Sequence, residues 1–312
     1  MQFRGDIKII KRIVFIGAGA IAGYLISGLV MKPGIEIYAA AEGERRERLK
    51  KDGIIVNGER MDIGIVSPDE MKDPDLIMVC VKYNALREVL PYIEKMAGVG
   101  TLIMLPLNGV DSEEIAAEAL GKDRIVPSFM KVSSRRIGND IRFDREKAGG
   151  LYFGEEDGIR TERIILLEEL FLGTGVRYHS VPNITVEMWK KFASNIARNL
   201  PQAVLDLGVG AYYKSEHLKY ISKRLKEEVR LVAKARGIDI YEDDSWDTVN
   251  TIPDDTRFST LQDIDAGRHT EIEMFSGVLI RYAKEAGIEV PFNEYTYHAI
   301  KCLEEKNDGI IS

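Results

Sequence analysis

The stretch IVFIGAGAIAGYLISGLV, residues 13–30, contains no charged residue and decides the fold. Its length alone would suit a transmembrane helix, which needs about 20 apolar residues. A secretory signal is a second alternative, and cleavage near residues 39–41 is compatible with the composition. Four glycines interrupt the stretch, and no second hydrophobic span follows it. We therefore favour a segment of a folded domain over a membrane anchor.

The stretch also divides internally into three parts. Ile13–Ile16 is β-branched and aromatic, as expected for a buried strand. Residues 17–23 read GAGAIAG, and residues 24–31 have the composition of a helix that ends before Pro33. Residues 35–40 then predict a second strand. The order of strand, glycine turn, helix and strand predicts the first unit of a dinucleotide-binding fold.

Glycine has a specific role at each position of such a turn. Gly17 would make the tight turn, and Gly19 would let the backbone approach a pyrophosphate. Ala22 stands where the pattern allows glycine or alanine, and Ala20 lies where the helix N-terminus faces the phosphates. We expect Gly17, Gly19, Ala20 and Ala22 to contact the cofactor. A glycine-rich packed helix without a ligand is the alternative.

Composition excludes several classes of protein. The net charge of −7 argues against a broad nucleic-acid surface, which needs a basic excess. Two cysteines far apart in sequence form no disulfide framework and fit a reducing, cytoplasmic location. The four histidines show no close pairing, so no metal site is expected. Small anionic ligands remain compatible with this charge, because they need only a local positive site.

Strand and helix patterns alternate up to about Val181, and helical patterns then predominate. We predict an α/β fold with an N-terminal, Rossmann-type, doubly wound parallel sheet and an all-helical C-terminal domain. The expected domains are residues 1–181, which would bind the dinucleotide, and residues 182–312, which would bind substrate and form a dimer. The expected C-terminal helices include residues 184–200, 216–237 and 270–287.

One predicted helix carries a polar stripe. Lys191, Asn195 and Asn199 stand at i, i+4 and i+8, which places a cation and two amides on one face. Such a stripe suits a polar substrate and one proton transfer. On periodicity alone an exposed polar face is the stronger interpretation, and the spacing does not choose between Lys191 and the adjacent Lys190. Downstream, Glu271 and Glu273 open another helix, where a glutamate also complements the helix dipole.

These motifs, in this order, resemble the ketopantoate reductase family (2-dehydropantoate 2-reductases). The resemblance covers nearly the whole chain after about a dozen residues. It rests on GAGAIAG (17–23), VCVKYNA (79–85), LNG (107–109), MWKKFASNIARN (188–199) and STLQDIDAGRHTEIE (259–273).

The resemblance implies a role for each matching residue. Lys191 matches the family's general acid, and Asn195 and Asn199 match residues that contact the substrate. Ser259 is expected near the substrate carboxylate, and Glu271 is expected to bond its hydroxyl. Two further matches, Asn108 and Lys82, are expected near the cofactor, with Asn108 close to the nicotinamide and the substrate.

The sequence also departs from the family pattern. The family usually has an arginine after the second strand for the 2′-phosphate of NADP, and Glu42 stands there instead. A carboxylate at this place favours NAD, although Arg45 or Arg46 is close enough in sequence to replace the missing cation. Leu107, Phe258 and Thr260 also differ from the usual residues, which leaves the identity of the substrate open.

We therefore expect an enzyme that uses NADPH or NADH to reduce a small 2-oxo acid, with ketopantoate as the family's substrate. An NAD-dependent D-2-hydroxyacid dehydrogenase that acts on other branched or aromatic 2-oxo acids is the first alternative. A nucleotide-binding sensor without catalysis is the second. The resemblance also implies a homodimer, and we expect neither nucleic acid nor a membrane as a partner.

Overall fold

The computed structural model describes residues 9–240 and 253–312 of the chain. It divides into two compact units. The N-terminal unit extends to Ile184, without residues 108–110. The C-terminal unit comprises Asn108–Val110 and Thr185–Ser312. The assignment of residues 1–181 to cofactor and residues 182–312 to substrate and dimerisation stays a prediction.

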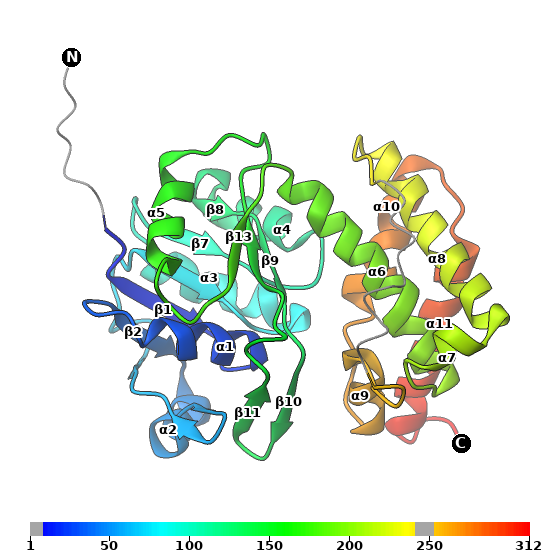
Figure 1. Cartoon of the computed structure of the whole chain (residues 1–312), viewed down its shortest axis with the longest axis horizontal. Helices are drawn as coiled ribbons and strands as arrows, with labels where there is room; N and C mark the ends of the chain where they lie inside the picture. The colour runs from blue at the N-terminus through cyan, green and yellow to red at the C-terminus, as the bar shows by residue number, and fades with distance from the viewer. Residues whose placement is uncertain (1–8, 241–252) are drawn as a thin grey trace. The chain divides into compact units, whose positions relative to one another are not determined.

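The N-terminal unit is built on a six-stranded parallel sheet (Figure 1). The strand order is β5-β2-β1-β6-β7-β8, so the chain winds outward from β1 first to one edge and then to the other. This order is that of the doubly wound dinucleotide-binding fold and confirms the predicted fold class. The six strands are β1 (Arg12–Ile16), β2 (Glu36–Ala40), β5 (Gly64–Val66), β6 (Leu76–Val79), β7 (Leu102–Met104) and β8 (Ile125–Val126).

Helices and two small sheets complete the N-terminal unit. The helices are α1 (Ala20–Leu29), α2 (Gly43–Asp52), η1 (Tyr83–Ala85), α3 (Leu86–Met96), α4 (Ser112–Leu120), η2 (Lys122–Arg124) and α5 (Glu162–Phe171). One small sheet has the order β10-β11-β3-β4, and the other has the order β13-β12-β9. Their strands are β3 (Ile55–Val56), β4 (Glu59–Arg60), β9 (Ser128–Lys131), β10 (Ser134–Ile137), β11 (Asp140–Phe143), β12 (Gly150–Phe153) and β13 (Tyr178–Ser180).

The apolar run of β1 is buried on both faces of the sheet. Ile13 and Phe15 belong to a core cluster that includes residues of α1. Val14 and Ile16 point the other way and belong to a second cluster with residues of α3 and α4. Burial of each such side chain contributes about 1.5–3 kcal/mol. This two-sided burial explains why the strand reads as a continuous apolar run.

Helix α1 begins earlier than the sequence indicates. The predicted helix started at Tyr24, whereas α1 starts at Ala20, directly after Gly19. Residues 20–23 read AIAG, and the three small residues among them were assigned to the turn. The helix N-terminus therefore lies within the glycine pattern itself, and only three residues separate it from the end of β1.

The described part of the C-terminal unit has only helical elements (Figure 1). They are α6 (Ile184–Leu205), α7 (Ala211–Lys214), α8 (Glu216–Ala235), α9 (Ser259–Asp265), the π-helical segment η4 (Glu273–Gly277), α10 (Val278–Ala286) and α11 (Pro291–Asn307). The apolar stripe of α6 is fully buried at Phe192 and Ile196. Aromatic contacts join this stripe to the neighbouring helices: Trp189 lies 6.1 Å from Tyr282, and Phe192 lies 6.3 Å from Phe275, between ring centroids.

Two C-terminal helices differ from their predicted form. The pattern predicted a helix that ends at Leu200, but α6 continues through Pro201 to Leu205. Proline removes one backbone donor and usually ends a helix, which explains the error. The predicted helix over residues 270–287 is interrupted, because residues 273–277 form a π-helical turn. Such turns are rare and often accompany functional sites.

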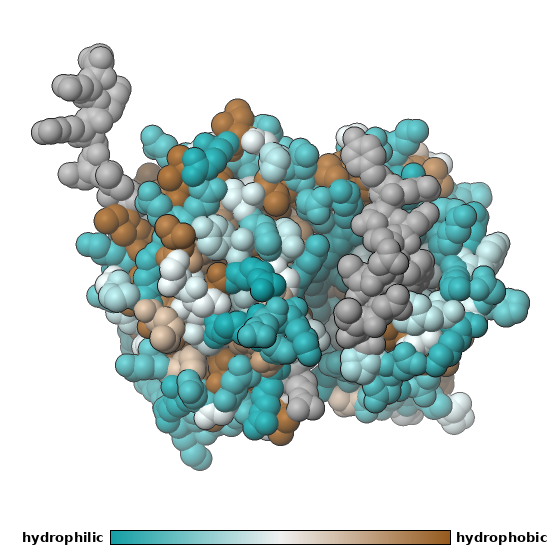
Figure 2. Space-filling view, viewed as in Figure 1, coloured by the Kyte–Doolittle hydropathy of each residue, from teal (hydrophilic) through white to brown (hydrophobic). Residues whose placement is uncertain are grey.

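Among the described helices, none combines the length and the apolar composition needed to cross a membrane. On the face seen in Figure 2, hydrophilic residues predominate among the coloured atoms, and hydrophobic residues are scattered.

Two acidic residues at the start of α4 are buried. Asp111 is at the N-cap position, but its carboxylate accepts a hydrogen bond of 2.7 Å from the Tyr83 hydroxyl. Glu113 is 8% exposed, and its Oε1 accepts a long hydrogen bond of 3.4 Å from the Ser128 N–H. Burial raises the pKa of Glu113 to about 8. This carboxyl group is therefore protonated in the folded protein at neutral pH.

We predict that Glu113→Gln makes stability less dependent on pH. The folded state keeps its proton up to a pKa of about 8, whereas the unfolded chain loses it near the ordinary pKa of 4.5. Stability therefore falls as pH rises through this window, by an amount on the order of a few kcal/mol. The variant should unfold at a similar temperature to the parent at pH 5 and at a higher one at pH 9. Glu114→Gln, at the exposed neighbouring position, is the control, and equal profiles for both variants would contradict the prediction.

Candidate functional site

The glycine turn after β1 is fixed by close packing against the next strand of the sheet. Gly17 has φ +103°, a conformation that side chains disfavour. A Cβ atom there would lie 2.4 Å from the carbonyl oxygen of Cys80, which follows β6. Both the backbone conformation and this contact therefore require glycine at position 17.

Gly19 meets a different requirement. Its φ of −90° is open to any residue, and a Cβ atom would have its nearest neighbour, the Cys80 carbonyl oxygen, at 3.9 Å. The protein itself therefore leaves room for a side chain at Gly19. What the missing side chain provides is open space in front of the first turn of α1, where backbone N–H groups have no intrahelical acceptor. Half-buried Ala20 opens this turn, and Ala22 packs fully buried behind it.

This arrangement fits the pyrophosphate of a dinucleotide. The first turn of α1 contains no acidic residue, so nothing opposes an anion at the positive end of the helix dipole. Ile16 pairs with Ala40 of β2 and with Val79 of β6. The segments after these three strands therefore start side by side, at the carboxyl ends of the parallel strands. They carry the glycine turn, Glu42 and Lys82.

Residues after β2 hold the charges that would meet the adenosine ribose. Glu42 is the exposed N-cap residue of α2, and Arg45 is exposed in the first turn of this helix. The Glu42 carboxylate accepts a hydrogen bond from the hydroxyl of Tyr92, which raises the pKa of Tyr92. Arg46 donates to both carboxylate oxygens of Glu70, at 2.6 and 2.5 Å. No sequence pattern indicated either partner, because Tyr92 and Glu70 lie in other segments of the chain.

In the C-terminal unit, Lys191 and Asn108 meet although 83 residues separate them in sequence. Lys191 Nζ donates a hydrogen bond of 2.7 Å to Asn108 Oδ1. A short bond from an ammonium to an amide oxygen is charge-assisted. The amide oxygen fixes the direction of the ammonium. Both side chains are half-buried, so they are shielded while one side of each stays accessible.

The predicted polar stripe lies on one uninterrupted helix. Asn195 is half-buried and Asn199 is 9% exposed, so neither has the full exposure expected of a solvated face. The adjacent Lys190 points to a different partner and forms an ion pair of 2.9 Å with Glu187. The structure thus distinguishes the two lysines by their neighbours, which the spacing did not.

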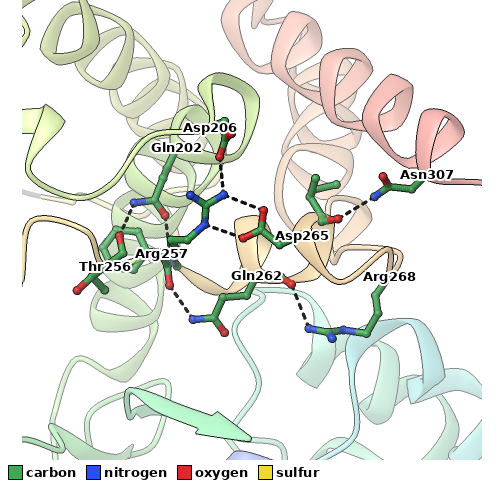
Figure 3. Close-up of polar contacts among 10 residues, drawn as sticks. Gln202, Asp206, Thr256, Arg257, Gln262, Asp265, Arg268 and Asn307 are labelled. Carbon is green, nitrogen blue, oxygen red and sulfur yellow. Dashed lines mark hydrogen bonds and ion pairs between the residues drawn. The ribbon is translucent and has the colours of Figure 1, made fainter. Parts of the chain in front are cut away.

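Gln202 extends the stripe by one further turn and fixes the loop that leads into α9 (Figure 3). It is fully buried. Its Oε1 accepts from the Phe258 N–H at 2.6 Å, and its Nε2 donates to the Thr256 carbonyl at 3.0 Å. Ser259, the first residue of α9, is exposed next to this anchored segment. The sequence analysis missed Gln202 because it ended the helix at Pro201.

Arg257 strengthens the same connection (Figure 3). Its guanidinium forms a bidentate pair with Asp265, at 2.6 and 2.7 Å, and also pairs with Asp206 beyond the end of α6. The two carboxylates, Asp265 foremost, raise the pKa of Arg257. The Arg257 carbonyl in turn accepts from Gln262 at 2.6 Å. The segment that carries Phe258 and Ser259 is thereby tied to α6 and α9.

Glu271 lies two residues before the start of the π-helical segment. It is half-buried, and its carbonyl accepts from the Met274 N–H at 3.0 Å. Glu273 has a structural role, because it accepts a hydrogen bond of 2.7 Å from the Tyr297 hydroxyl. The two glutamates, which the sequence did not separate, thus have different environments.

The site residues predicted from the sequence fall into two sets. Gly17, Gly19, Ala20, Ala22, Glu42, Arg45 and Lys82 belong to the N-terminal unit. Lys191, Asn195, Asn199, Ser259, Glu271 and Asn108 belong to the C-terminal unit. The three residues Asn108–Val110 belong to the C-terminal unit, although in sequence they come after β7 of the N-terminal unit. Within the described residues, no three histidine, cysteine, aspartate or glutamate side chains gather as metal ligands.

Comparison with known families covers both units. Residues 13–158 match the model of ketopantoate reductase PanE/ApbA, and residues 183–304 match the model of its C-terminal domain. The chain belongs to the ketopantoate reductase family. It is therefore an oxidoreductase with a nicotinamide cofactor.

Characterised relatives of this ketopantoate reductase family member are distant but match it from end to end. The 2-dehydropantoate 2-reductase of Archaeoglobus fulgidus is 27% identical over 300 residues, which cover 95% of this chain and 98% of that protein. The 2-dehydropantoate 2-reductase of Pyrococcus horikoshii is 26% identical and is covered to 99%, against 96% of this chain.

Solved structures share the fold. A ketopantoate reductase of the same family from Ralstonia eutropha matches with a TM-score of 0.82 at 22% identity, over 95% of this chain and 99% of its own. A D-mandelate dehydrogenase, solved with NADH and anilino(oxo)acetate, matches with a TM-score of 0.82 at 20% identity and the same coverage. One architecture thus occurs in proteins named for a 2-oxo acid, ketopantoate, and for a 2-hydroxy acid, mandelate.

We predict that Gly17→Ala and Gly19→Ala fail in different ways. The first should destabilise the family member by at least about 1–3 kcal/mol, because a Cβ collides with the Cys80 carbonyl and φ is unfavourable. The second should unfold like the parent in urea but bind dinucleotide at least about tenfold more weakly, because the Cβ fills the space for the pyrophosphate. Equal stability losses in both variants, or undiminished binding by Gly19→Ala, would contradict this assignment.

We also predict that Gln202→Leu costs about 2–4 kcal/mol of unfolding free energy, because two partly buried backbone groups lose their partner. Asn307→Ala is the control, since it removes one exposed hydrogen bond of 2.9 Å to the Ile264 carbonyl in the same unit (Figure 3). The control should cost less than about 1 kcal/mol. Urea unfolding of both variants measures the difference, and similar losses would mean that Gln202 does not anchor the loop.

Proposed function

We propose that this protein reduces a 2-oxo acid to the corresponding 2-hydroxy acid with a reduced nicotinamide dinucleotide, and that ketopantoate is its first candidate substrate. The observation that carries the proposal is the hydrogen bond between Lys191 and Asn108 at the start of an amide-lined stripe. It joins two separate family motifs through a contact that a purely structural lysine does not require. The names of the curated relatives support the choice of substrate.

Lys191 has the chemistry of the general acid in this proposal. The bound cofactor supplies a hydride to the carbonyl carbon, and negative charge then develops on the carbonyl oxygen. The Lys191 ammonium stabilises this charge and donates the proton that completes the hydroxyl group. Asn108 directs the ammonium through its amide oxygen.

The remaining residues of the C-terminal set bind and orient the substrate. Asn195 and Asn199 offer amide donors and acceptors along the same helical face as Lys191. The Ser259 hydroxyl is proposed to bond the substrate carboxylate, and its backbone is fixed through Gln202. Glu271 is proposed to bond the hydroxyl group of the substrate and so orient the carbonyl for reduction.

The N-terminal set holds the cofactor in this proposal. Gly17, Gly19, Ala20 and Ala22 form the pyrophosphate turn, and Lys82 lies at the same edge of the sheet. Both NADPH and NADH fit this turn, because they share the pyrophosphate. Glu42 favours NADH, whose ribose hydroxyls can donate to a carboxylate, whereas Arg45 could meet an added phosphate.

The second candidate is an NAD-dependent D-2-hydroxyacid dehydrogenase for other branched or aromatic 2-oxo acids. Glu42 and the aromatic Phe258 beside Ser259 favour it. A structural neighbour named as D-mandelate dehydrogenase, solved with NADH, supports the combination of this fold with NADH. A nucleotide-binding sensor without catalysis is the third candidate.

We also propose the assembly and domain roles implied by the resemblance. Residues 1–181 would bind the cofactor, and residues 182–312 would bind substrate and form a homodimer in the cytoplasm. A structural neighbour described as a dimeric ketopantoate reductase from Staphylococcus aureus supports the dimer.

The deciding experiment follows the loss of reduced-nicotinamide absorbance with NADH and NADPH, each with ketopantoate and with branched and aromatic 2-oxo acids. Lys191→Ala should lower kcat by about 10²–10⁴-fold on the best substrate, because the proton donor is removed. Lys190→Ala is the matched control on the same helix and should retain kcat, since Lys190 pairs with Glu187.

Each result of this assay has a definite meaning. Turnover of ketopantoate alone supports the first proposal, and turnover of other 2-oxo acids with NADH supports the second. Near-normal kcat for Lys191→Ala would refute the general-acid role. Binding of cofactor without turnover of any member of the panel would favour the sensor.

A further inference from the structure

We propose that two carboxylates held in place by neighbouring elements make the N-terminal unit select NADH against NADPH: Glu42 at the ribose position and Glu70, which holds Arg46. This inference rests on the cofactor site of the proposed function. It adds the residues that set the selectivity. Glu70 and Tyr92 lie outside every motif on which the family resemblance rests.

The position of Glu42 follows from the sheet. Ala40, the last residue of β2, pairs with Ile16, the last residue of β1. Glu42 stands two residues beyond Ala40. It occupies the N-cap position of α2, and its backbone is extended. A carboxylate at this place in a doubly wound fold accepts hydrogen bonds from the adenosine ribose. It repels a phosphate on the same ribose by like charge.

Tyr92 donates a hydrogen bond to the Glu42 carboxylate at the protein surface. The tyrosine lies in α3, which follows β6, so the contact joins two different crossover helices of the sheet. A hydrogen bond from a phenol leaves further lone pairs of the carboxylate available for a ribose. Tyr92 is therefore a positioning residue, which acts on the cofactor through Glu42.

Glu70 pairs with Arg46, the cation that would otherwise neutralise a 2′-phosphate. It follows β5, the edge strand that pairs with β2, and Val66 lies opposite Ala40 in the register. The Ser67 N–H donates to Glu70 Oε2 at 2.9 Å, and Arg46 makes its bidentate contact from α2. These donors, Ser67 foremost, hold the pKa of Glu70 below its ordinary value, so the carboxylate stays ionised. Arg46 has a side-chain exposure of 22%, against 50% for Glu70.

Lys95, a second cation near Glu42, is also paired with a carboxylate. Lys95 of α3 forms an ion pair with Asp69, the neighbour of Glu70 in sequence. The field of Glu42 adds to that of Asp69 in raising the pKa of Lys95. A phosphate monoester brings about −1.5 to −2 charges at neutral pH. To bind it through Arg46 or Lys95, this edge would have to break an existing ion pair beside an additional carboxylate.

The test measures binding of NADH and NADPH to the full-length protein by nicotinamide fluorescence, without any 2-oxo acid. The parent should bind NADH more tightly than NADPH. Glu70→Gln keeps an acceptor for the Ser67 N–H but releases Arg46, so its Kd for NADPH should fall by about three- to tenfold with little change for NADH. Tyr92→Phe should weaken NADH by about two- to fivefold.

Glu156→Gln is the matched control. It makes the same change of charge and breaks an exposed ion pair with Lys122 of η2, the short helix that directly precedes β8 at the opposite edge of the sheet. The control should leave both dissociation constants unchanged. Tighter binding of NADPH than NADH by the parent would overturn the inference. An equal response of Glu70→Gln and Glu156→Gln would overturn the role of Glu70.

The binding test is independent of the proposed reaction. Selective binding of NADH without turnover of any 2-oxo acid would refute the reductase and leave the selectivity intact. Turnover of a 2-oxo acid with equal affinity for both cofactors would refute the selectivity and leave the reductase intact.

Discussion

The contact of Gly17 with the Cys80 carbonyl is the constraint on which the cofactor edge depends. It brings the segments after β1 and β6 together at the point where the strand order of the sheet reverses. The tight turn lets α1 begin three residues beyond the strand, so its N-terminus faces this point. Any side chain at Gly17 would push the turn away from β6. The position of the helix dipole, and with it the anion site, follows from one missing Cβ atom.

The C-terminal site depends on a different kind of constraint, the regular spacing of one long helix. Lys191, Asn195, Asn199 and Gln202 share a face because α6 runs without a break through Pro201. A neighbouring stripe of this helix is anchored by buried aromatic residues such as Phe192. Gln202 then holds the loop before α9, while Lys191 holds Asn108. A single rigid element therefore orients groups from three distant parts of the sequence.

Sequence patterns predicted the features that arise within one element. The glycine spacing around Gly17 and the stripe from Lys191 to Asn199 each lie within one short segment of sequence. They can therefore be recognised without a structure. The start of α1 and the continuation of α6 were mispredicted, because small residues and Pro201 obey average propensities that packing overrides here. Partners such as Tyr92 for Glu42 and Glu70 for Arg46 come from other elements. No periodicity encodes them, because only the register of β1, β2 and β5 brings those elements together.

Charge explains why a protein with a net charge of −7 can bind an anionic cofactor. At the pyrophosphate turn the attraction comes from backbone N–H groups and the dipole of α1, which are present whatever the net charge. An additional 2′-phosphate lies beyond the reach of this dipole, whose effect fades within one turn. It must be neutralised by side chains, and here Arg46 and Lys95 already face carboxylates. An acidic chain therefore accommodates the shared part of both cofactors through its backbone, while its side chains decide between them.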